Sequence, residues 1–387
     1  MKISILTPDL SHNCLGRAWV LAKILEKKYK VEILGPIYGD GIWKPFENME
    51  DIPLIELPIP KLKNRSKFKS AIRQKINGDL IYASKPLYSS FGVGLIAKKL
   101  HKTPLILDID DWQMGFTKAY TKKFNLFQYL KFLSSSLFSL FHPSNYYNNL
   151  YYEKRSSRAD AITVSNHFLQ EKFGGIIIPH CRDPEVLNPI NHSGEKIRKK
   201  YKLQNKKVVS FIGTPTKYKG VDDIIEALSL IKNNDLIFLL VGLKDVLYHN
   251  YLRKLGKEKL GRRFVPIPMQ PFSLLPELLA ASDITAIPQK ETIETIGQLP
   301  AKVFDAMAME KPIVATNVND LPIILEGVGW IVQPGNIKEL EEAFLDILNS
   351  PKKAREYGKK ARERCINKYS FAAQENKLVT LIEQLLH

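Results

Sequence analysis

Residues 2–34 read KISILTPDLSHNCLGRAWVLAKILEKKYKVEIL. The apolar runs at 2–6 and 31–34 have the length of buried strands, and the spacing of apolar residues at 16–28 predicts an amphipathic helix that ends in a basic turn. A strand, a helix and a second strand in this order form a unit whose two strands run parallel in one sheet. This segment therefore predicts an α/β fold.

The same alternation continues along both halves of the chain. In the first half, strand-like runs follow at 80–83, 105–109, 161–164 and 176–178. In the second half, strand-like runs lie at 208–212, 237–241, 264–267, 284–287 and 313–315, with helical patterns at 221–231, 276–281 and 300–309. This repetition predicts two doubly wound, Rossmann-like domains, and 387 residues at roughly 150 per domain agree with that number.

The domain boundaries follow from changes in composition. We expect an N-terminal domain at 1–187, a polar and basic linker at 188–206 and a C-terminal domain at 207–370. The helical pattern at 371–387 is expected to pack back toward the N-terminal domain. Because ligands of parallel sheets bind outside the carboxyl ends of the strands, the working site is expected in a cleft between the domains.

Cysteine usage and hydropathy narrow the class of protein. Cys14, Cys181 and Cys365 lie far apart without CxxC spacing, which argues against a disulfide framework and a structural zinc site and fits a reducing, cytoplasmic compartment. No run reaches about 18 uninterrupted apolar residues, and the first residues lack the pattern of a signal peptide. We therefore expect neither a secreted nor a membrane-spanning protein.

The formal net charge of +17 is concentrated in one region. Residues 61–158 hold 18 Lys and Arg against five Asp and Glu, which leaves +13 in a quarter of the chain. The basic run 61–75 and the insertion 116–152, which is dense in Phe, Tyr and Leu, are together typical of an interfacial segment on anionic lipid. An excursion that packs on its own domain or on a second subunit is the alternative. The cationic residues expected at the membrane or acceptor are Lys63, Arg65, Lys67, Lys69, Lys122 and Lys123.

Residues 213–223, GTPTKYKGVDD, predict a binding site for a diphosphate. Gly213 frees the backbone after a strand, Thr214 offers a hydroxyl, and Lys217 and Lys219 place two ammonium groups just before a helix begins. Lysine charges and a helix N-terminus both favour an anion. The loop lacks the Walker A pattern, and a solvated turn is the alternative.

Residues 297–316, GQLPAKVFDAMAMEKPIVAT, contain a second candidate. Pro300 predicts the start of a helix, which leaves Lys302 and Asp305 three residues apart on its first turn. The carboxylate can accept both hydroxyls of a ribose while the lysine meets phosphate. A surface ion pair is the alternative.

The strand at 105–109 runs into the sequence LDIDDWQ. Three carboxylates in four residues are costly to bury, which indicates that one of them meets substrate. Strand alternation predicts Asp108 and Asp110 on one face and Asp111 on the other. No further ligands accompany this spacing, so no metal site is predicted.

Taken together, these motifs resemble those of the nucleotide-sugar glycosyltransferases of the GT-B fold, specifically glycosyltransferase family 4. RADAITVSNHFLQEKF and IIIPHCRD resemble the family's ADxVxxxS strand and IPNGVD turn. FIGTPTKYKGVDDIIEAL resembles GRLxxxKGxxxLIxA, and LPELLAASDITAIPQ resembles LPxLLAxADxxxxPS. The stretch 297–316 resembles the ExFGLPxLEAMAxGKPVVAT block that carries two donor-binding glutamates.

The resemblance implies two Rossmann-like domains facing a central cleft and the retaining transfer of a sugar from a nucleoside diphosphate sugar. It implies no metal ion and no cofactor beyond that substrate. Because the basic and aromatic stretches belong to the acceptor domain, we expect a lipid-linked acceptor or a polysaccharide or glycolipid precursor. The expected location is cytoplasmic, on the inner face of the cell membrane.

Carried onto this sequence, the resemblance assigns Lys219 to the donor diphosphate, where it stabilises the leaving group, and Asp305 to the ribose. Thr214 stands where the family has an arginine, and Lys217 can substitute for that charge. Gly16, which opens a helix, aligns with a glycine of the first-domain loop. From the residues alone, Gly16 can bring backbone N–H groups to a phosphate or sugar or be an ordinary turn glycine.

Two departures concern the reacting centre. Gly297 replaces the glutamate that usually touches the donor sugar, and Glu291 or Glu294 can reach in from the loop instead. Asp110 and Asp111 align with the family's His-Asp pair and are expected to orient or deprotonate the acceptor hydroxyl.

Other classes stay open at this point. A nucleotide-sugar epimerase or a phosphorylase of the GT-B fold is the nearer alternative. A basic nucleic-acid-binding protein is permitted by the charge and the interleaved aromatic residues, but no recognised nucleic-acid module appears, so no nucleic-acid partner is expected.

Overall fold

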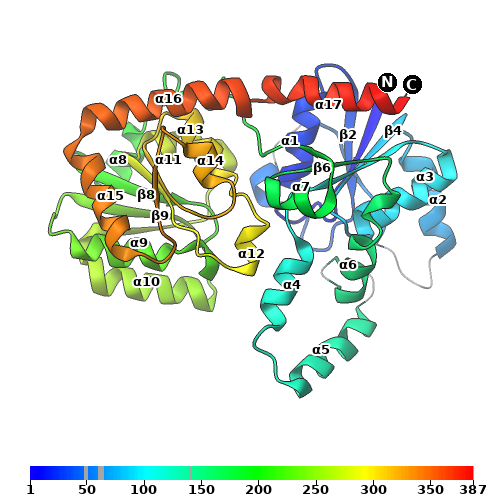
Figure 1. Cartoon of the computed structure of the whole chain (residues 1–387), viewed down its shortest axis with the longest axis horizontal. Coiled ribbons are helices and arrows are strands. Elements are labelled where there is room, and N and C mark those ends of the chain that lie inside the picture. Colours follow the sequence, from blue (N-terminus) through cyan, green and yellow to red (C-terminus); the bar gives the residue numbers. More distant parts are fainter. Residues whose placement is uncertain (48–50, 60–64, 140–141, 144, 387) are drawn as a thin grey trace. The chain divides into compact units, whose positions relative to one another are not determined.

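The structure, a computed structural model, describes residues 1–47, 51–59, 65–139, 142–143 and 145–386. The chain divides into two compact units (Figure 1). The first comprises Met1–His180, Gly297–Leu299 and Phe371–His387, and the second comprises Cys181–Ile296 and Pro300–Ser370. Each unit is built on one parallel sheet, so the expected α/β class with two Rossmann-like domains is confirmed.

The sheet of the first unit has the strand order β3-β2-β1-β4-β5-β6-β7. Its strands are β1 (Lys2–Leu6), β2 (Lys30–Gly35), β3 (Leu54–Glu56), β4 (Leu80–Ser84), β5 (Leu105–Ile109), β6 (Ala161–Val164) and β7 (Ile176–Ile177). The helices are α1 (Leu15–Leu25), α2 (Arg65–Lys75), α3 (Val93–His101), α4 (Gln113–Thr121), α5 (Leu126–Phe138), α6 (Tyr146–Glu153), α7 (His167–Phe173) and α17 (Phe371–Leu386).

Burial on both faces of this sheet explains the continuous apolar runs of its strands. All five residues of β5 are buried, and α17 packs against α1, where the rings of Trp19 and Phe371 lie 6.2 Å apart (Figure 1). The strand order reverses between β1 and β4, which is the point where sheets of this kind bind ligands.

The second unit repeats the arrangement with the order β10-β9-β8-β11-β12-β13. Its strands are β8 (Lys207–Ile212), β9 (Leu236–Leu243), β10 (Phe264–Pro268), β11 (Ile284–Ile287), β12 (Ile313–Thr316) and β13 (Trp330–Val332). Its helices are α8 (Glu195–Lys200), α9 (Val221–Leu230), α10 (Leu247–Leu260), α11 (Leu275–Ala280), α12 (Ile293–Ile296), α13 (Lys302–Ala308), α14 (Leu321–Leu325), α15 (Ile337–Asn349) and α16 (Pro351–Tyr369).

The segment expected as a linker, 188–206, contributes to the core of the second unit. It contains α8, and Ile197 and Leu203 are buried in one apolar cluster with Val208 and Leu239. Across the described ranges, every helix is either too short or too polar to cross a bilayer.

A buried ion pair fixes the carboxyl edge of the first sheet. Arg17 Nε and Nη2 donate to the carboxylate of Asp108 at 2.9 and 2.7 Å, and Thr163 Oγ1 donates to the same carboxylate at 2.8 Å. The guanidinium also donates to the carbonyl oxygens of Ile178 and Pro179. Burial is the largest single influence and lowers the pKa of Arg17, but the charge and hydrogen bonds of Asp108, together with the charge of Asp110, outweigh it and raise that pKa above its usual range. The pair therefore ties α1 to β5 and to the segment after β7.

Replacement of Arg17 by Met should lower the unfolding free energy of the first unit by about 3–5 kcal/mol, because it leaves the buried charge of Asp108 uncompensated. The matched control is Lys98→Met, which breaks the partly exposed pair with Asp160 and should cost at most about 1 kcal/mol. Urea unfolding followed by circular dichroism measures both. Equal losses in the two variants would contradict a structural role for the buried pair.

Candidate functional site

The first candidate group lies where β4 and β5 end. Lys85 Nζ is 2.7 Å from Asp110 Oδ1 and 2.5 Å from Asp111 Oδ2, and Gln298 Nε2 donates to Asp111 Oδ1 at 3.1 Å. Burial by itself lowers the pKa of Lys85, yet the two carboxylates outweigh burial and raise that pKa, so the ammonium group stays charged. The group thus holds two negative charges against one buried cation.

The expected alternation of the three carboxylates is wrong beyond the end of the strand. β5 ends at Ile109, so Asp110 and Asp111 leave the pleat and both reach Lys85, whereas Asp108 is fully buried against α1. Asp110 is buried and Asp111 is only half-buried. Of the three, Asp111 is therefore the most accessible to a ligand.

The sequence interpretation missed Lys85. Its φ of +68° lies in the left-handed region that an L-residue rarely adopts, and its backbone N–H donates to the carbonyl oxygen of Asp108 at 2.7 Å. The available signal was a lone lysine directly after the fully buried strand β4, at the edge of the sheet where ligands bind.

Gly297 is required by close packing. A Cβ atom at this position would lie 2.5 Å from the Cβ atom of Trp112, and the Gly297 carbonyl oxygen accepts a hydrogen bond from the Trp112 backbone N–H at 3.2 Å. A glutamate here would therefore collide with Trp112. Of the two residues considered as substitutes, Glu291 is exposed and Glu294 lies half-buried in α12.

Gly16 lies in the first turn of α1. A Cβ atom there would lie 3.6 Å from the Trp43 ring, an ordinary contact, so packing does not require a glycine. The Gly16 N–H already donates to the carbonyl oxygen of Asn13 at 3.1 Å. Nothing in its surroundings distinguishes it from a turn glycine.

The second candidate group lies where β8 ends. Gly213, with a φ of +126°, opens the loop toward α9, and Gly220 closes it with a φ of +64°. A Cβ atom on Gly220 would lie 1.9 Å from the carbonyl oxygen of Pro288, so only glycine fits there. Within the loop, Lys217 and Thr214 are exposed, and Lys219 Nζ donates to the Thr214 carbonyl oxygen at 2.9 Å.

Lys302 reaches this loop from α13. Its Nζ atom lies 3.2 Å from the centroid of the Phe211 ring, and a Cβ atom on Gly213 would lie 3.3 Å from the same nitrogen. Although the side chain as a whole is partly exposed, its nitrogen is buried, and no described residue accepts a hydrogen bond from it. Burial lowers the pKa of Lys302 well below its usual range, and the charge of Lys219 lowers it further.

Asp305, one turn along α13, pairs with a residue that the sequence interpretation missed. Arg182 Nε donates to Asp305 Oδ1, and both side chains are largely buried. Arg182 lies in the stretch IIIPHCRD, which resembles the family's IPNGVD turn. That resemblance was the one sequence feature that pointed to this segment. Pro300 precedes the helix, and its carbonyl oxygen accepts from the Val303 N–H at 3.2 Å.

The two acidic residues at the start of α9 share one cation. Lys290 Nζ lies 2.7 Å from Asp222 Oδ2 and 3.2 Å from Asp223 Oδ1. One ammonium group thus offsets part of the negative charge of these two carboxylates. Within the described ranges, no group of three or more His, Cys, Asp or Glu residues has the arrangement of a metal site.

The residues expected at a membrane are only partly described. Lys63 lies outside the described residues, and Arg65 is the first residue of α2. Lys67 and Lys69 are exposed on α2, and Lys122 and Lys123 are exposed in the turn before α5.

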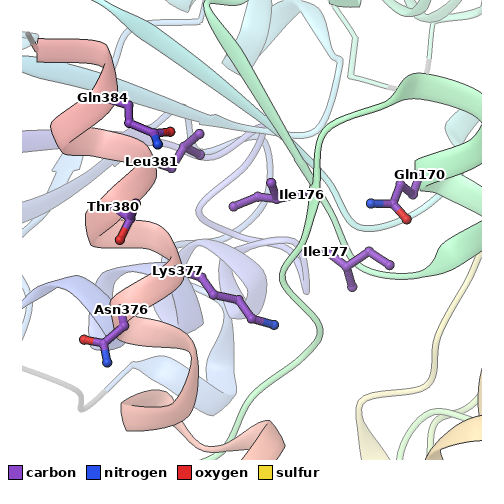
Figure 2. Close-up of a pocket in the computed structure, with 8 residues that line it drawn as sticks. All are labelled: Gln170, Ile176, Ile177, Asn376, Lys377, Thr380, Leu381 and Gln384. Carbon is purple, nitrogen blue, oxygen red and sulfur yellow. The ribbon is translucent and has the colours of Figure 1, made fainter.

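A pocket of about 550 Å³ lies between β7 and α17 (Figure 2). Ile176 and Ile177 line one side, and Lys377, Thr380 and Leu381 line the other. None of the candidate catalytic, donor-binding or membrane residues lines this pocket, although Gln170, Ile176 and Ile177 belong to two of the quoted motifs.

The match to a family of known proteins falls on the second unit, which holds Lys219 and Lys302. Residues 193–364 match the family model described as "Glycosyl transferases group 1". Over 195 residues, 49% of this chain and 49% of the relative, the chain is 24% identical to alpha-D-kanosaminyltransferase of Streptomyces kanamyceticus. The chain spans about half the length of the curated relatives it matches.

Two solved structures match the chain over nearly its whole length. Sucrose-phosphate synthase from Thermosynechococcus elongatus is 16% identical with a TM-score of 0.74, covering 100% of this chain and 99% of that one. Anabaena Alr3699/HepE in complex with UDP-glucose is 18% identical with a TM-score of 0.74, covering 99% and 100%. The chain therefore has the GT-B fold of these solved structures, and the match to the family model is confined to residues 193–364.

Proposed function

We propose that this protein is a retaining glycosyltransferase that moves a sugar from a nucleoside diphosphate sugar to an acceptor. The observation that carries the proposal is the cluster of Lys219 and Lys302 around Gly213, at the strand edge where a parallel sheet binds ligands. Two lysine nitrogens at one strand edge suit a diphosphate, because both can donate hydrogen bonds to it. The match to a protein solved with UDP-glucose supports the same substrate class.

In this proposal the two lysines stabilise the charge that develops on the departing diphosphate. Asp305 would accept the ribose hydroxyls. Arg182 engages one of its oxygens, and a carboxylate offers about four acceptor positions, so Asp305 retains capacity for them.

The acceptor would meet Asp111 in the first unit. Asp111 is more exposed than Asp110, and Lys85 with Gln298 fixes its orientation. Since retaining transfer from the front face needs little from an enzymic nucleophile, we assign Asp111 to orienting the acceptor hydroxyl or taking its proton, and Asp110 to positioning it through Lys85.

Lys219→Ala should lower kcat/KM about 30-fold, which corresponds to about 2 kcal/mol of lost transition-state stabilisation. Asp305→Ala should mainly weaken nucleotide binding. The assay is release of nucleoside diphosphate from a panel of UDP, GDP and ADP sugars, with Lys232→Ala, an exposed lysine of the same unit, as the control. Wild-type rates and donor affinity in both site variants would refute this donor site.

The same assay on the wild-type chain separates the enzyme classes. Release of nucleoside diphosphate that needs no acceptor would favour an epimerase, and release that needs inorganic phosphate would favour a phosphorylase.

Turnover should not require a divalent cation. In the described chain, Asp108 in β5 is paired with Arg17, and Asp110 and Asp111 directly after β5 are paired with Lys85, so no free carboxylate set remains there for a metal ion. The measurement is activity after EDTA treatment, with and without added Mg²⁺ or Mn²⁺. Loss of activity that either cation restores would overturn the proposed metal-independent mechanism.

We further propose that the first unit binds an anionic membrane surface and takes a lipid-linked or polysaccharide-precursor acceptor there. Support comes from α5, whose inner residue Phe132 packs against Tyr146 of α6 while Phe127 is 75% and Phe138 92% exposed. Leu126, Leu130 and Leu137 are also exposed on this helix, which extends away from the sheet of the first unit (Figure 1). Exposed aromatic residues beside lysines are typical of interfacial helices.

The proposed location is the cytoplasmic face of the cell membrane. The lysines that flank the exposed face of α5, Lys122, Lys123 and Lys131, carry the charge that anionic lipid attracts. Cys14, Cys181 and Cys365 are buried and form no disulfide with one another, which agrees with a reducing compartment.

Co-sedimentation with liposomes tests the membrane proposal. Each lysine near an anionic surface contributes on the order of 1 kcal/mol, so binding should grow with anionic lipid and weaken with salt. It should fall in the double variants Phe127→Ser with Phe138→Ser and Lys67→Ser with Lys69→Ser. The matched control is Leu247→Ser, which removes a residue 91% exposed on α10 of the other unit. Equal recovery in the supernatant with neutral and anionic vesicles would refute the proposal and favour a packing role for α5.

A further inference from the structure

Two features disfavour the charged form of Lys302: its nitrogen is buried, and Lys219 in the turn before α9 adds a like charge. The face of the Phe211 ring on β8, against which Nζ lies, attracts a cation but offers no hydrogen-bond acceptor of the strength that an oxygen supplies. The one carboxylate that acts on it, Asp305 of the same helix, is already paired with Arg182. No described residue accepts a hydrogen bond from the Lys302 nitrogen.

An ammonium group in such a place costs free energy, and lysine responds by losing its proton. The direction of the shift agrees, since burial and then Lys219 lower the pKa of Lys302 well below its usual range. Arginine cannot respond in this way because it stays protonated in proteins. A lysine at this position can therefore change charge when its surroundings change.

We propose that Lys302 is uncharged in the free protein and takes up a proton from solvent when a nucleoside diphosphate binds beside it. The bound diphosphate would bring two or more negative charges next to Nζ and replace the missing hydrogen-bond acceptor, so the ammonium form becomes the favoured one. The inference rests on the proposed donor site. It adds that binding of the nucleoside diphosphate is accompanied by uptake of one proton. The free protein then keeps its donor site less positive than its lysine count implies.

Because nucleotide binding takes up a proton, the affinity for the nucleotide depends on pH. Below the lowered pKa of free Lys302, the side chain carries its proton in both states, and above the pKa of the bound state it carries none in either. Proton uptake is therefore largest between the two values. Affinity for the nucleotide should fall as the pH rises through this window, because each binding event needs a proton that becomes scarcer.

Isothermal titration calorimetry measures the uptake directly. The full chain is titrated with UDP, GDP and ADP in buffers of different ionisation enthalpy at about pH 8, where the terminal phosphate, whose pKa is about 6, contributes little. The slope of observed enthalpy against buffer enthalpy gives the number of protons bound. For whichever nucleotide binds, we expect a slope up to about one proton per nucleotide.

Two variants separate the proton from the positive charge. Lys302→Arg keeps a permanent cation and should bind nucleotide with a slope near zero, and Lys302→Met should lose both the slope and affinity. Lys232→Met, at an exposed position of the same unit, should keep the wild-type slope. Thermal unfolding checks that each variant is folded. If Lys302→Arg does not fold, Lys302→Met alone tests whether the proton uptake depends on Lys302.

The outcomes distinguish this inference from the proposed function. Nucleotide binding by the wild-type chain with no proton uptake, or with uptake that persists in Lys302→Met, would overturn the inference and leave the donor site standing. Failure of all three nucleotides to bind the wild-type chain would overturn the donor site and the inference with it. Uptake that disappears only in the Lys302 variants would support both.

Discussion

The ion pair between Arg17 and Asp108 is the constraint on which the carboxyl edge of the first sheet depends. A buried carboxylate needs a partner for its charge and donors for its lone pairs, and Arg17 and Thr163 supply both. Because Asp108 is engaged in this way, the two carboxylates that follow are left to Lys85. Of the three carboxylates at this strand end, Asp108 therefore stabilises the fold, whereas Asp110 and Asp111 lie where a ligand can bind.

The two units contain buried lysines in opposite electrostatic settings. Lys85 faces two carboxylates, which hold it charged and fix the local charge balance whether or not a ligand is present. Lys302 lies beside an aromatic ring and a second lysine, and in our proposal its charge depends on whether a nucleoside diphosphate is bound. One residue type thus serves as a fixed counter-ion in one unit and as a group with adjustable charge in the other, and the difference comes from the neighbours alone.

Sequence pattern predicted the fold well where strands are buried on both faces. The strands expected at 105–109, 161–164 and 284–287 are found with the same bounds, because a polar residue or a proline directly follows each apolar run, namely Asp110, Ser165 and Pro288. The edge strands β3 and β13 escaped notice because each has three residues and is only partly buried. Pattern also failed at 188–206, where two apolar side chains join a core that a polar composition did not suggest.

The candidate site was predictable only in its residue types. Motif spacing identified Lys219, Lys302 and Asp305, but it could not identify Arg182 or Phe211, since contacts across a sheet leave no mark in local spacing. The same limit applies to Gly297, whose need for glycine arises from Trp112, far away in the chain. The roles of these residues in binding stay predictions.

The composition of the first unit has a consequence for synthesis. This unit begins at the N-terminus, yet it includes Gly297–Leu299 and Phe371–His387. At about 5–20 residues per second, roughly 10–40 s separate translation of His180 from translation of Phe371. Trp19 lacks Phe371 for the whole of that interval, and Trp112 lacks Gly297 for roughly its first 6–23 s, so apolar surface on the nascent unit stays uncovered. Of the two units, the one whose synthesis starts earlier is thus completed later, and neither unit can be obtained by cutting the chain once.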